Sequence, residues 1–369
     1  MTLVTFTITS QSNSARAGEF RTAHGIIHTP FYMPVVTKGT GKFLTFASLE
    51  NAKTKCFISN AYLLYLKPGL DTIELAGGYH NFINWQKPIF TDSGGFQLLN
   101  PQFLIALSDK GVQFRSPFSG DIHFISPEKL TEIQNKLGSD VAMVLDHVIY
   151  PNHTRKEFEV ATGRTIAWAS RCLETHRNKS QKLFGIVQGG TYLDLRKECA
   201  IKINEMGFDG LAIGGLAIGE PKQEMFKAID ASLEYLDKDK LKYLMGVGSP
   251  EDMVISIGKG IDCFDSIYPT KMARHGILFT KDGPLKLAKS YNSNLFRPIE
   301  EGCDCYACTH HTLAYLHHLY RLGEPTVKFL LSEHNICFIN RLMDDSRQAI
   351  ENGTFDVFQK EFLKRYLKY

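Results

Sequence analysis

The clearest pattern in the chain is a series of short apolar runs beginning near residue 86, each ending in a polar or glycine-rich turn. Amphipathic segments, such as 155–177 and 191–208, lie between the runs. Continuous apolar strands that alternate with helices predict a parallel sheet covered by those helices. The runs KPIFT, DVAMVL, LFGIV, GLAI, LKYLM and CF end just before Asp92, Asp146, Gln188, Gly214, Gly246 and Asp265.

At least six such units in series favour a closed β/α barrel over an open nucleotide-binding sheet. An open sheet of that kind would carry a glycine-rich turn after its first strand and an acidic residue about 20 positions later, and neither stands there. A single Asp after a strand is often only a helix N-cap. Because the active site of a barrel lies at the carboxyl ends of its strands, we predict that Asp92, Asp146, Gln188, Gly215 and Asp265 converge at one mouth.

The two ends of the chain depart from this rhythm. The first forty residues are predicted to form strands and turns, whereas the segments 309–324 and 338–369 have a helical pattern and the second is predicted to close the barrel. No apolar stretch reaches the roughly 18 residues of a membrane span, and the N-terminus lacks the basic start and apolar block of a secretory signal. The formal charge of +3 neither requires nor excludes a nucleic-acid partner. A cytoplasmic location is expected.

Three of the eight cysteines fall within six positions, in the pattern Cys303-x-Cys305-x2-Cys308. A disulfide framework would be more even and would suit a shorter, secreted chain. Three thiolates and one imidazole suit tetrahedral Zn²⁺, and four protein ligands leave no position for an activated water, so the ion is expected to be structural. The fourth ligand is predicted to be His334, with His310 and His311 as the alternatives that lie closer in sequence.

Five motifs carry a resemblance to a known family. TDSGGFQ (91–97), FGIVQGG (184–190), LAIGGLAIGE (211–220), LMGVGSPED (244–252) and FDSIYPT (264–270) resemble motifs of the tRNA-guanine transglycosylases. The resemblance implies an α/β fold, a (β/α)8 TIM barrel over residues 1–369, with a zinc-binding subdomain inserted at 290–345. Archaeal relatives carry a C-terminal RNA-binding extension, so a chain that stops at Tyr369 is similar to the shorter bacterial form. The implied activity exchanges guanine at the wobble position of tRNA for a 7-deazaguanine base.

Base exchange with retention at the ribose carbon is most simply achieved by two displacements through a covalent intermediate. A carboxylate suits the nucleophile, and a second carboxyl group can move the proton of the base. Residue chemistry alone does not separate the two roles; the resemblance places the nucleophile at Asp265 and the acid/base group at Asp92.

The base-binding set combines hydrogen-bonding groups with stacking groups. A carboxylate can accept from both the ring N–H and the amino group of guanine, so Asp146 is predicted to recognise the base. Gln188 and the backbone of Gly214, Gly215 and Leu216 would bond the carbonyl face of the base, and Phe96 and Met245 would stack on its ring. The whole predicted set is Ser93, Gly94, Gly95, Phe96, Asp146, Gln188, Gly214, Gly215, Leu216 and Met245.

The RNA contacts are predicted in two segments near the mouth. Lys271 stands where many relatives have arginine, which keeps the charge and loses bidentate geometry. Lys42, Lys281 and Lys286 are weaker candidates, better explained as solvated surface. The predicted set is Gly246, Val247, Gly248, Ser249, Pro250, Glu251, Asp252, Thr270, Lys271, Met272, Ala273 and Arg274.

One segment departs from the bacterial pattern. Asp146 is followed by His147, Val148, Ile149, Tyr150 and Pro151, where bacterial members have Glu-Cys and a proline-rich turn. The incoming base is therefore open between queuine, slightly favoured, and 7-aminomethyl-7-deazaguanine, which Ile218 and Glu220 favour.

Two other functions stay open at this point. One is a barrel N-glycosidase or hydrolase that uses the same carboxylate pair, and the other is a non-catalytic partner subunit, which retention of the three acids argues against. Resemblance also implies a homodimer, with the zinc subdomain near its interface.

Overall fold

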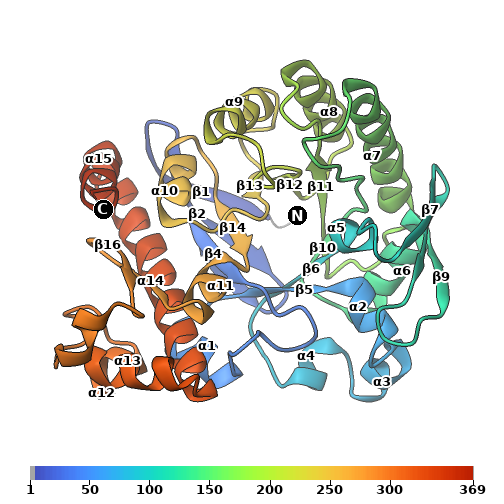
Figure 1. Cartoon of the computed structure of the whole chain (residues 1–369). Coiled ribbons are helices and arrows are strands. Elements are labelled where there is room, and N and C mark those ends of the chain that lie inside the picture. The colour runs from blue at the N-terminus through green and yellow to red at the C-terminus, as the bar shows by residue number, and fades with distance from the viewer. Residues whose placement is uncertain (1–4, 369) are drawn as a thin grey trace.

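The computed structural model describes residues 5–368 and places eight parallel strands in one sheet (Figure 1). The strands run in the order β4-β14-β13-β12-β11-β10-β6-β5, and the two edge strands meet through a parallel bridge between Val35 and Ile58. The amide of Val36 donates to the Ile58 carbonyl over 2.8 Å, so the sheet closes into a barrel. The barrel strands are β4 (Phe31–Pro34), β5 (Phe57–Asn60), β6 (Ile89–Asp92), β10 (Val141–Met143), β11 (Lys182–Val187), β12 (Gly210–Ile213), β13 (Leu241–Leu244) and β14 (Cys263–Ser266).

Helices surround the barrel and confirm the predicted α/β class. The segment expected at 155–177 forms α7, whose N-cap Thr154 and Glu157 make a reciprocal capping box, and the segment expected at 191–208 forms α8. The surrounding helices are α1 (Phe46–Asn51), α2 (Ala61–Leu66), α3 (Leu70–Leu75), α4 (Tyr79–Ile83), α5 (Gly95–Leu98), α6 (Pro127–Leu137), α7 (Arg155–Thr175), α8 (Leu193–Glu205), α9 (Lys222–Leu233), α10 (Pro250–Gly258) and α11 (Tyr268–Arg274).

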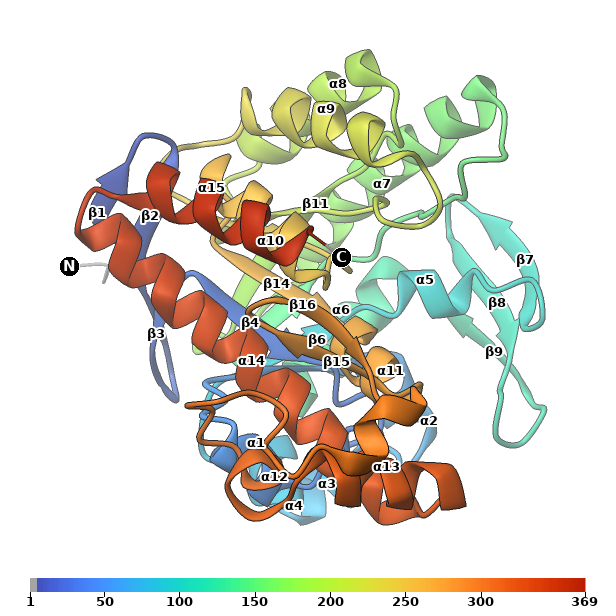
Figure 2. The same ribbon diagram turned by 60° about the vertical axis from the view of Figure 1, so that its left-hand side comes forward.

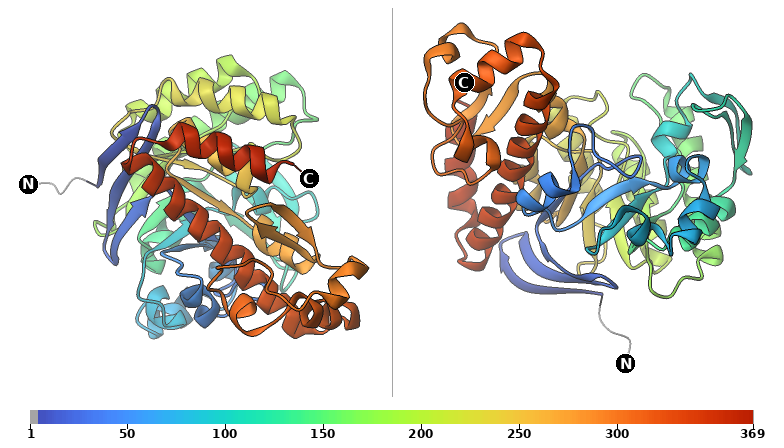
Figure 3. Two further views of the ribbon diagram at one scale, coloured as in Figure 1. Left: turned by 90° about the vertical axis from the view of Figure 1, so that its left-hand side faces the viewer. Right: turned by 90° about the horizontal axis from the view of Figure 1, so that it is seen from below.

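The first residues form an antiparallel sheet of β1 (Phe6–Ser12), β2 (Ala15–Thr22) and β3 (Gly25–Thr29), seen at one end of the barrel in Figure 3. Phe20 from β2 packs against Phe90 and Phe184 of the barrel, with ring centroids 6.1 and 5.7 Å apart. This sheet therefore closes the end opposite the mouth with aromatic side chains.

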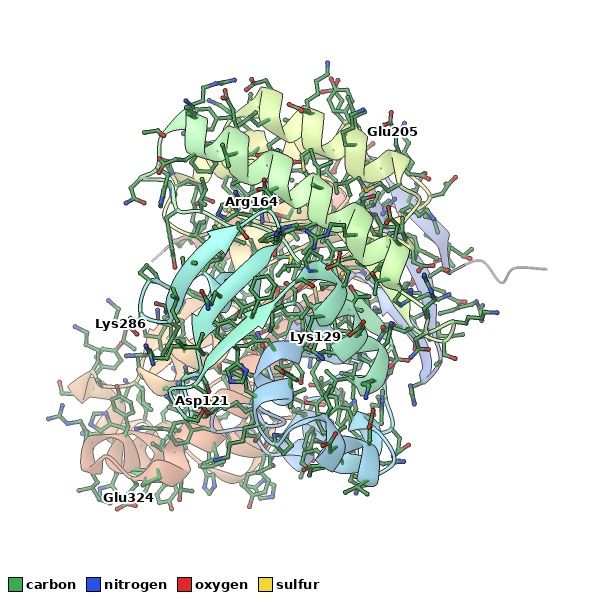
Figure 4. All side chains as sticks on the ribbon, turned by 90° about the vertical axis from the view of Figure 1, so that its right-hand side faces the viewer. Asp121, Lys129, Arg164, Glu205, Lys286 and Glu324 are labelled. Carbon is green, nitrogen blue, oxygen red and sulfur yellow. The ribbon has the colours of Figure 1, made fainter. Side chains whose placement is uncertain are left out.

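A second antiparallel sheet interrupts the barrel between β6 and α6, a feature absent from the prediction. It consists of β7 (Leu104–Ser108), β8 (Gly111–Arg115) and β9 (Ile122–Ile125). Arg164 of α7 lies against this sheet in Figure 4, and its Nε donates to Asp109 over 2.9 Å.

The C-terminal elements cover the remaining side of the barrel, as predicted (Figure 2). The long helix α14 packs against β1, β2, β4 and α11, and its neighbour α15 packs against α10. The predicted end of the zinc-binding subdomain, residue 345, lies inside α14, so this one helix contains both His334 and residues that cover the barrel. The subdomain boundaries at 290 and 345 stay a prediction. These elements are β15 (Ile277–Thr280), β16 (Gly283–Lys286), the 3-10 helix η1 (Ser290–Asn294), α12 (Tyr306–His310), α13 (Leu313–Leu322), α14 (Pro325–Glu351) and α15 (Phe355–Tyr366).

Candidate active site

A cavity of about 740 Å³ opens at the carboxyl ends of the barrel strands. Its walls come from residues at or just beyond the ends of seven of the eight strands, which is where a β/α barrel places its active site. The ends of strands that are distant in the sequence therefore meet around one cavity, as the sequence predicts. The wall residues include Asn60, Asp92, Gln97, Asp146, Val148, Tyr150, Gly214, Gly215, Leu216, Tyr243, Met245, Asp265 and Lys271.

Asp265 lies near the end of β14 and faces the cavity. Its Oδ1 accepts hydrogen bonds from the Tyr243 hydroxyl (2.6 Å) and from the Gly246 amide (2.9 Å). Burial raises the pKa of Asp265, and the hydrogen bonds from Tyr243 and Gly246 oppose that rise by favouring the ionised form. The carboxylate is thus held in one orientation by two donors.

Asp92 is the last residue of β6 and faces the same cavity. Burial, followed by the nearby charges of Asp146 and Asp265, raises the pKa of Asp92 to about 7, against the lowering effect of the Gly94 and Ser93 amides. A carboxyl group that titrates near neutrality can both donate and accept a proton at physiological pH. Asp92 and Asp265 thus differ in their hydrogen bonding: two donors hold one oxygen of Asp265, whereas Asp92 is influenced by the Gly94 and Ser93 amides and by two nearby acids.

Asp146 and Gln188 form a buried, hydrogen-bonded pair beside the cavity. The Gln188 amide Nε2 donates to Oδ2 of Asp146 over 2.6 Å, and each residue is 3% exposed. Burial raises the pKa of Asp146 to about 6, although the hydrogen bonds from Gln188 and the Ser93 hydroxyl lower it. Asp146 therefore carries substantial negative charge at neutral pH, and it forms part of the cavity wall.

Two glycines are required by close approach to this pair. A Cβ at Gly95 would lie 2.5 Å from Oδ1 of Asp146, and a Cβ at Gly215 would lie 2.1 Å from Oε1 of Gln188. Gly215 also has a φ of +66°, which glycine adopts without strain. The glycine-rich turns of the sequence thus bring backbone against the buried polar pair.

The structure brings most of the predicted base-binding set together. Five members line the cavity, namely Asp146, Gly214, Gly215, Leu216 and Met245. Ser93 and Gln188 lie behind the wall and hold Asp146. The side chain of Phe96 lies outside the described part of the structure, which describes only its backbone in α5.

The segment after Asp146 separates into inward and outward residues. Val148 and Tyr150 line the cavity, whereas His147 turns toward α7, where its amide donates to Thr165 and its Nδ1 accepts from Arg164 over 3.2 Å. Burial and the adjacent Arg164 lower the pKa of His147 to about 4, so the ring is neutral at physiological pH. Of the residues that depart from the bacterial pattern, Val148 and Tyr150 therefore form part of the cavity wall, and His147 does not.

The two predicted RNA segments flank the cavity, and several of their side chains have local partners. Ser249 caps α10, and Lys222 pairs with Glu251 and Asp252, each over 2.9 Å. Arg274 Nη1 is buried without an acceptor among residues 5–368. Gly246, Val247, Gly248, Ser249, Glu251, Asp252 and Lys271 line the cavity, while Pro250, Thr270, Met272, Ala273, Arg274, Lys42, Lys281 and Lys286 do not.

The predicted metal ligands form a second, separate cluster. The Nδ1 atom of His334 lies 3.8, 3.3 and 3.5 Å from the sulfurs of Cys303, Cys305 and Cys308, and all four residues are buried. Tetrahedral zinc with thiolate and imidazole ligands would place N and S about 3.6 Å apart. The His334 Nε2 bonds the carbonyl of Phe279 over 2.9 Å, which leaves Nδ1 free for the ion. This cluster could hold a metal ion.

The structure separates His334 from its rivals. His310 and His311 do not belong to this four-residue cluster, and the ring of His310 stacks on Tyr306. Cys337, one helical turn beyond His334, lies close to Cys303 and Asp304, a neighbourhood the sequence analysis missed.

Two further residues of the site were missed. Tyr243 stands two positions before Met245, and alternation along a strand signals that both point inward. Arg196 precedes Cys199, Ala200 and Ile203 at helical spacing, so a charge stands on the apolar face of α8. A charged residue on an apolar helix face was the signal in the sequence that could have identified Arg196 as a candidate.

A closed parallel barrel whose mouth holds Asp92, Asp146 and Asp265 at the ends of its strands defines an enzyme of the β/α-barrel class. The model of one family, described as Queuine tRNA-ribosyltransferase, matches residues 10–368. The chain belongs to this family.

Individual relatives are similar over nearly the whole chain, and each bears the name Queuine tRNA-ribosyltransferase. That of Thermoanaerobacter pseudethanolicus is 45% identical over 358 residues, covering 96% of this chain and 94% of the relative. That of Thermotoga neapolitana is 44% identical over 361 residues, covering 98% of each. Separately, no helix among the described residues is long and apolar enough to cross a membrane.

Proposed function

We propose that this protein is a tRNA-guanine transglycosylase, which exchanges guanine at the wobble position of tRNA for a 7-deazaguanine base in queuosine modification. The observation that carries the proposal is the pair Asp92 and Asp265, which face one cavity from different strands with different hydrogen bonding. Membership of the family supports the same activity.

In the first displacement, a carboxylate oxygen of Asp265 bonds to C1′ of the ribose while the bond from C1′ to N9 of guanine breaks. The electron pair of that bond goes to the base, and protonated Asp92 supplies the proton that the departing guanine needs. A pKa of about 7 leaves a large fraction of Asp92 protonated at neutral pH. The product is a ribosyl ester of Asp265 and free guanine.

In the second displacement, N9 of the incoming base gives its proton to ionised Asp92 and attacks C1′. The ester bond breaks, and its electron pair returns to the Asp265 carboxylate. Two inversions at C1′ give net retention, and Asp92 finishes protonated for the next cycle.

Recognition of the base rests on the buried pair and the glycine turn. The Asp146 carboxylate accepts from the ring N–H and amino group of guanine, and the amides near Gly215 donate to its carbonyl oxygen. A 7-deazaguanine presents the same edge, so one pocket serves the leaving and the incoming base. Phe96 and Met245 are assigned to the two faces of the ring.

We further infer that queuine is the incoming base. Val148 and Tyr150 stand in the cavity wall where bacterial members have Glu-Cys and a proline-rich turn, and the cavity of about 740 Å³ has room for a side arm larger than aminomethyl. Competition between queuine and 7-aminomethyl-7-deazaguanine for incorporation into tRNA tests this point. Preference for the aminomethyl base would overturn it and leave the exchange activity standing.

The tRNA is proposed to lie across the mouth, on the segments 246–252 and 270–274. Lys271 offers an exposed cation at the cavity wall. Contacts of this kind position the phosphate backbone and leave recognition of the base to the pocket.

The ion of the Cys3His cluster is proposed to be structural Zn²⁺, one per chain. All four ligands come from the protein, which leaves no position for a reactive water, and the cluster lies outside the residues that line the cavity. Zinc would join the Cys303–Cys308 loop to α14 and take no part in the exchange.

A homodimer is also proposed. Six large apolar or aromatic side chains between residues 291 and 329, the stretch that contains the three clustered cysteines, are exposed by 38–79%, and a second copy of the chain could cover them. Light scattering at assay concentration should report twice the mass of one chain, and a fully active monomer would contradict this. The exposed residues are Tyr291, Phe296, Tyr306, Tyr315, Leu322 and Phe329.

The central test follows labelled guanine into tRNA and traps the covalent intermediate on a denaturing gel. Wild type should incorporate label and form an adduct, and Asp265→Asn should do neither because an amide cannot form the ribosyl ester. Asp230→Asn, at an exposed aspartate paired with Lys259, should behave as wild type. An adduct in Asp265→Asn would refute the nucleophile, and base release without incorporation would indicate a hydrolase instead.

A further inference from the structure

Arg196 of α8 is fully buried and bonds only to backbone carbonyls. Nε donates to Gly190 (2.7 Å), Nη1 donates to Val187 (3.0 Å) and Gly214 (2.9 Å), and Nη2 makes a longer contact of 3.5 Å with Gly215. No ion pair to Arg196 occurs within residues 5–368. Burying a guanidinium costs free energy, and here backbone oxygens of two loops offset that cost.

The loop that contains Gly214 and Gly215 presents amide donors to the cavity. In a planar trans peptide the C=O and the next N–H point in opposite directions. Because the carbonyls of Gly214 and Gly215 point to Arg196, the N–H groups of Gly215 and Leu216 point away from it. Both residues line the cavity, and neither N–H has an acceptor within the described chain.

The other loop runs from Val187 to Gly190 and contains Gln188. The carbonyls of Val187 and Gly190, which flank it, accept from Arg196, and its own amide donates to Cys199 Sγ over 3.2 Å. The Gln188 side chain in turn holds Asp146. One guanidinium therefore fixes the backbone on both sides of the residue that orients the buried carboxylate.

We propose that Arg196 is the positioning residue for base recognition: it directs the amides of Gly215 and Leu216, and the side chain of Gln188, toward the purine edge. The proposal rests on the proposed function, because it assigns the guanine or 7-deazaguanine base to this wall of the cavity. Arg196 acts through these groups and does not line the cavity itself.

Arginine is required by geometry as well as charge. Its planar fork offers five N–H donors, whereas lysine offers three donors at one point. Lysine at 196 would keep the cation and leave carbonyls unpaired, so both loops could relax. We expect Arg196→Lys to weaken the binding of free guanine, and to raise KM for the incoming base, by about tenfold, the effect of losing one or two hydrogen bonds. The kcat at saturating base should stay within about threefold.

Arg16 offers a matched control. It is also buried, donates to the carbonyls of Lys238 and Lys240, and pairs with Asp262. Asp262 precedes β14, at the end of the barrel opposite the cavity. Arg16→Lys should therefore lower Tm as Arg196→Lys does, without changing the affinity for guanine.

The experiment measures guanine binding by calorimetry, steady-state exchange and Tm for wild type and both variants. Unchanged guanine affinity in Arg196→Lys, or an equal loss in Arg16→Lys, would overturn the assignment. If Arg196→Lys does not fold, Arg196→Gln replaces it, and failure of both while Arg16→Lys folds would assign Arg196 to the core alone. Absence of exchange by wild type would instead refute the proposed function, while guanine binding would still report on Arg196.

Discussion

Tyr243 and Asp265 are joined by a hydrogen bond of 2.6 Å from the phenol to Oδ1. The Gly246 amide donates to the same oxygen, and within residues 5–368 no donor reaches Oδ2. A carboxylate held by one oxygen presents the other to a reacting carbon. The bonds also favour the ionised form against the effect of burial, which raises the pKa of Asp265. Tyr243 therefore serves both the orientation and the charge of the proposed nucleophile.

Tyr243→Phe is expected to lower kcat about tenfold and to move the acid limb of the pH–rate profile to higher pH. Loss of a donor to the ionised form raises the pKa of Asp265, so a higher pH is needed to ionise it. The measurement is kcat/KM for exchange against pH. Tyr32→Phe is the control, because Tyr32 is equally buried beside Asp265 but donates to the Ser266 carbonyl. An acid limb that stays in place in Tyr243→Phe would contradict the role.

Asp92→Asn is expected to abolish exchange and to stabilise the fold at pH 8. Burial and two neighbouring acids raise the pKa of Asp92 to about 7, well above the ordinary value of about 3.9 in an unfolded chain. The folded state thus binds its proton more tightly, and stability falls as pH rises from about 4 to 7. Asparagine removes that cost, which for a pKa difference of about three is on the order of 4 kcal/mol above pH 7.

Chemical unfolding of wild type and Asp92→Asn at pH 5, 6.5 and 8 checks the sign. The gain in the free energy of unfolding should be largest at pH 8 and shrink toward pH 4. Asp230→Asn, at an exposed position, should show no such gain. A gain independent of pH would mean that Asp92 is ionised with an ordinary pKa.

Loss of a metal ligand is expected to lower metal content and stability together, since structural sites couple binding to folding. His334→Ala and Cys305→Ala should both lose the ion, whereas His310→Ala and Cys337→Ser should keep it. Metal analysis and Tm on the same samples provide the test. Full metal content in His334→Ala would contradict the ligand set, and loss in Cys337→Ser would assign that neighbouring thiol a place in it.

The barrel was predictable where apolar strands alternate with amphipathic helices. From β6 onward each barrel strand lies in a continuous apolar run that is followed by a polar or glycine residue, and amphipathic helices separate most of these strands. The earlier units were not counted as barrel strands because β4 and β5 are followed by helices of only five or six residues, which show no clear helical period. The sheet β7–β9 was not predicted because its strands are half exposed and interrupt the repeat of apolar strands and helices.

The site was predictable where chemistry stands at strand ends, as for Asp92, Asp146 and Asp265. Tyr243 and Arg196 were not predicted, because each acts by contact with residues distant in sequence. No periodicity specifies that a guanidinium on α8 meets carbonyls of two different loops. The roles assigned to the site residues stay predictions, while their common place at the mouth follows from the fold.

Asp140, at the end of the barrel opposite the cavity, ties the N-terminal sheet to the barrel. Its carboxylate accepts from the amide and Nδ1 of His24 (3.0 Å each), from Nε2 of His80 (3.2 Å) and from the amide of Ile89 (2.8 Å). The two imidazoles stack with centroids 3.6 Å apart. His24 lies in the turn after β2 and His80 in α4, so one carboxylate joins three separate segments.

We expect Asp140→Asn to destabilise the fold at neutral pH by about 2 kcal/mol or more and to have a shrinking effect in acid. Burial raises the pKa of Asp140, but the bonds from His80, Ile89 and His24 outweigh it and lower the pKa to about 2. A folded pKa below the unfolded value of about 3.9 gives stability that is present above pH 4 and lost as pH falls through 2. Urea unfolding at pH 7, 4 and 3 should therefore show wild type converging on the variant. A difference that stays constant down to pH 3 would mean that the carboxylate charge contributes nothing and that only the shape of the side chain matters.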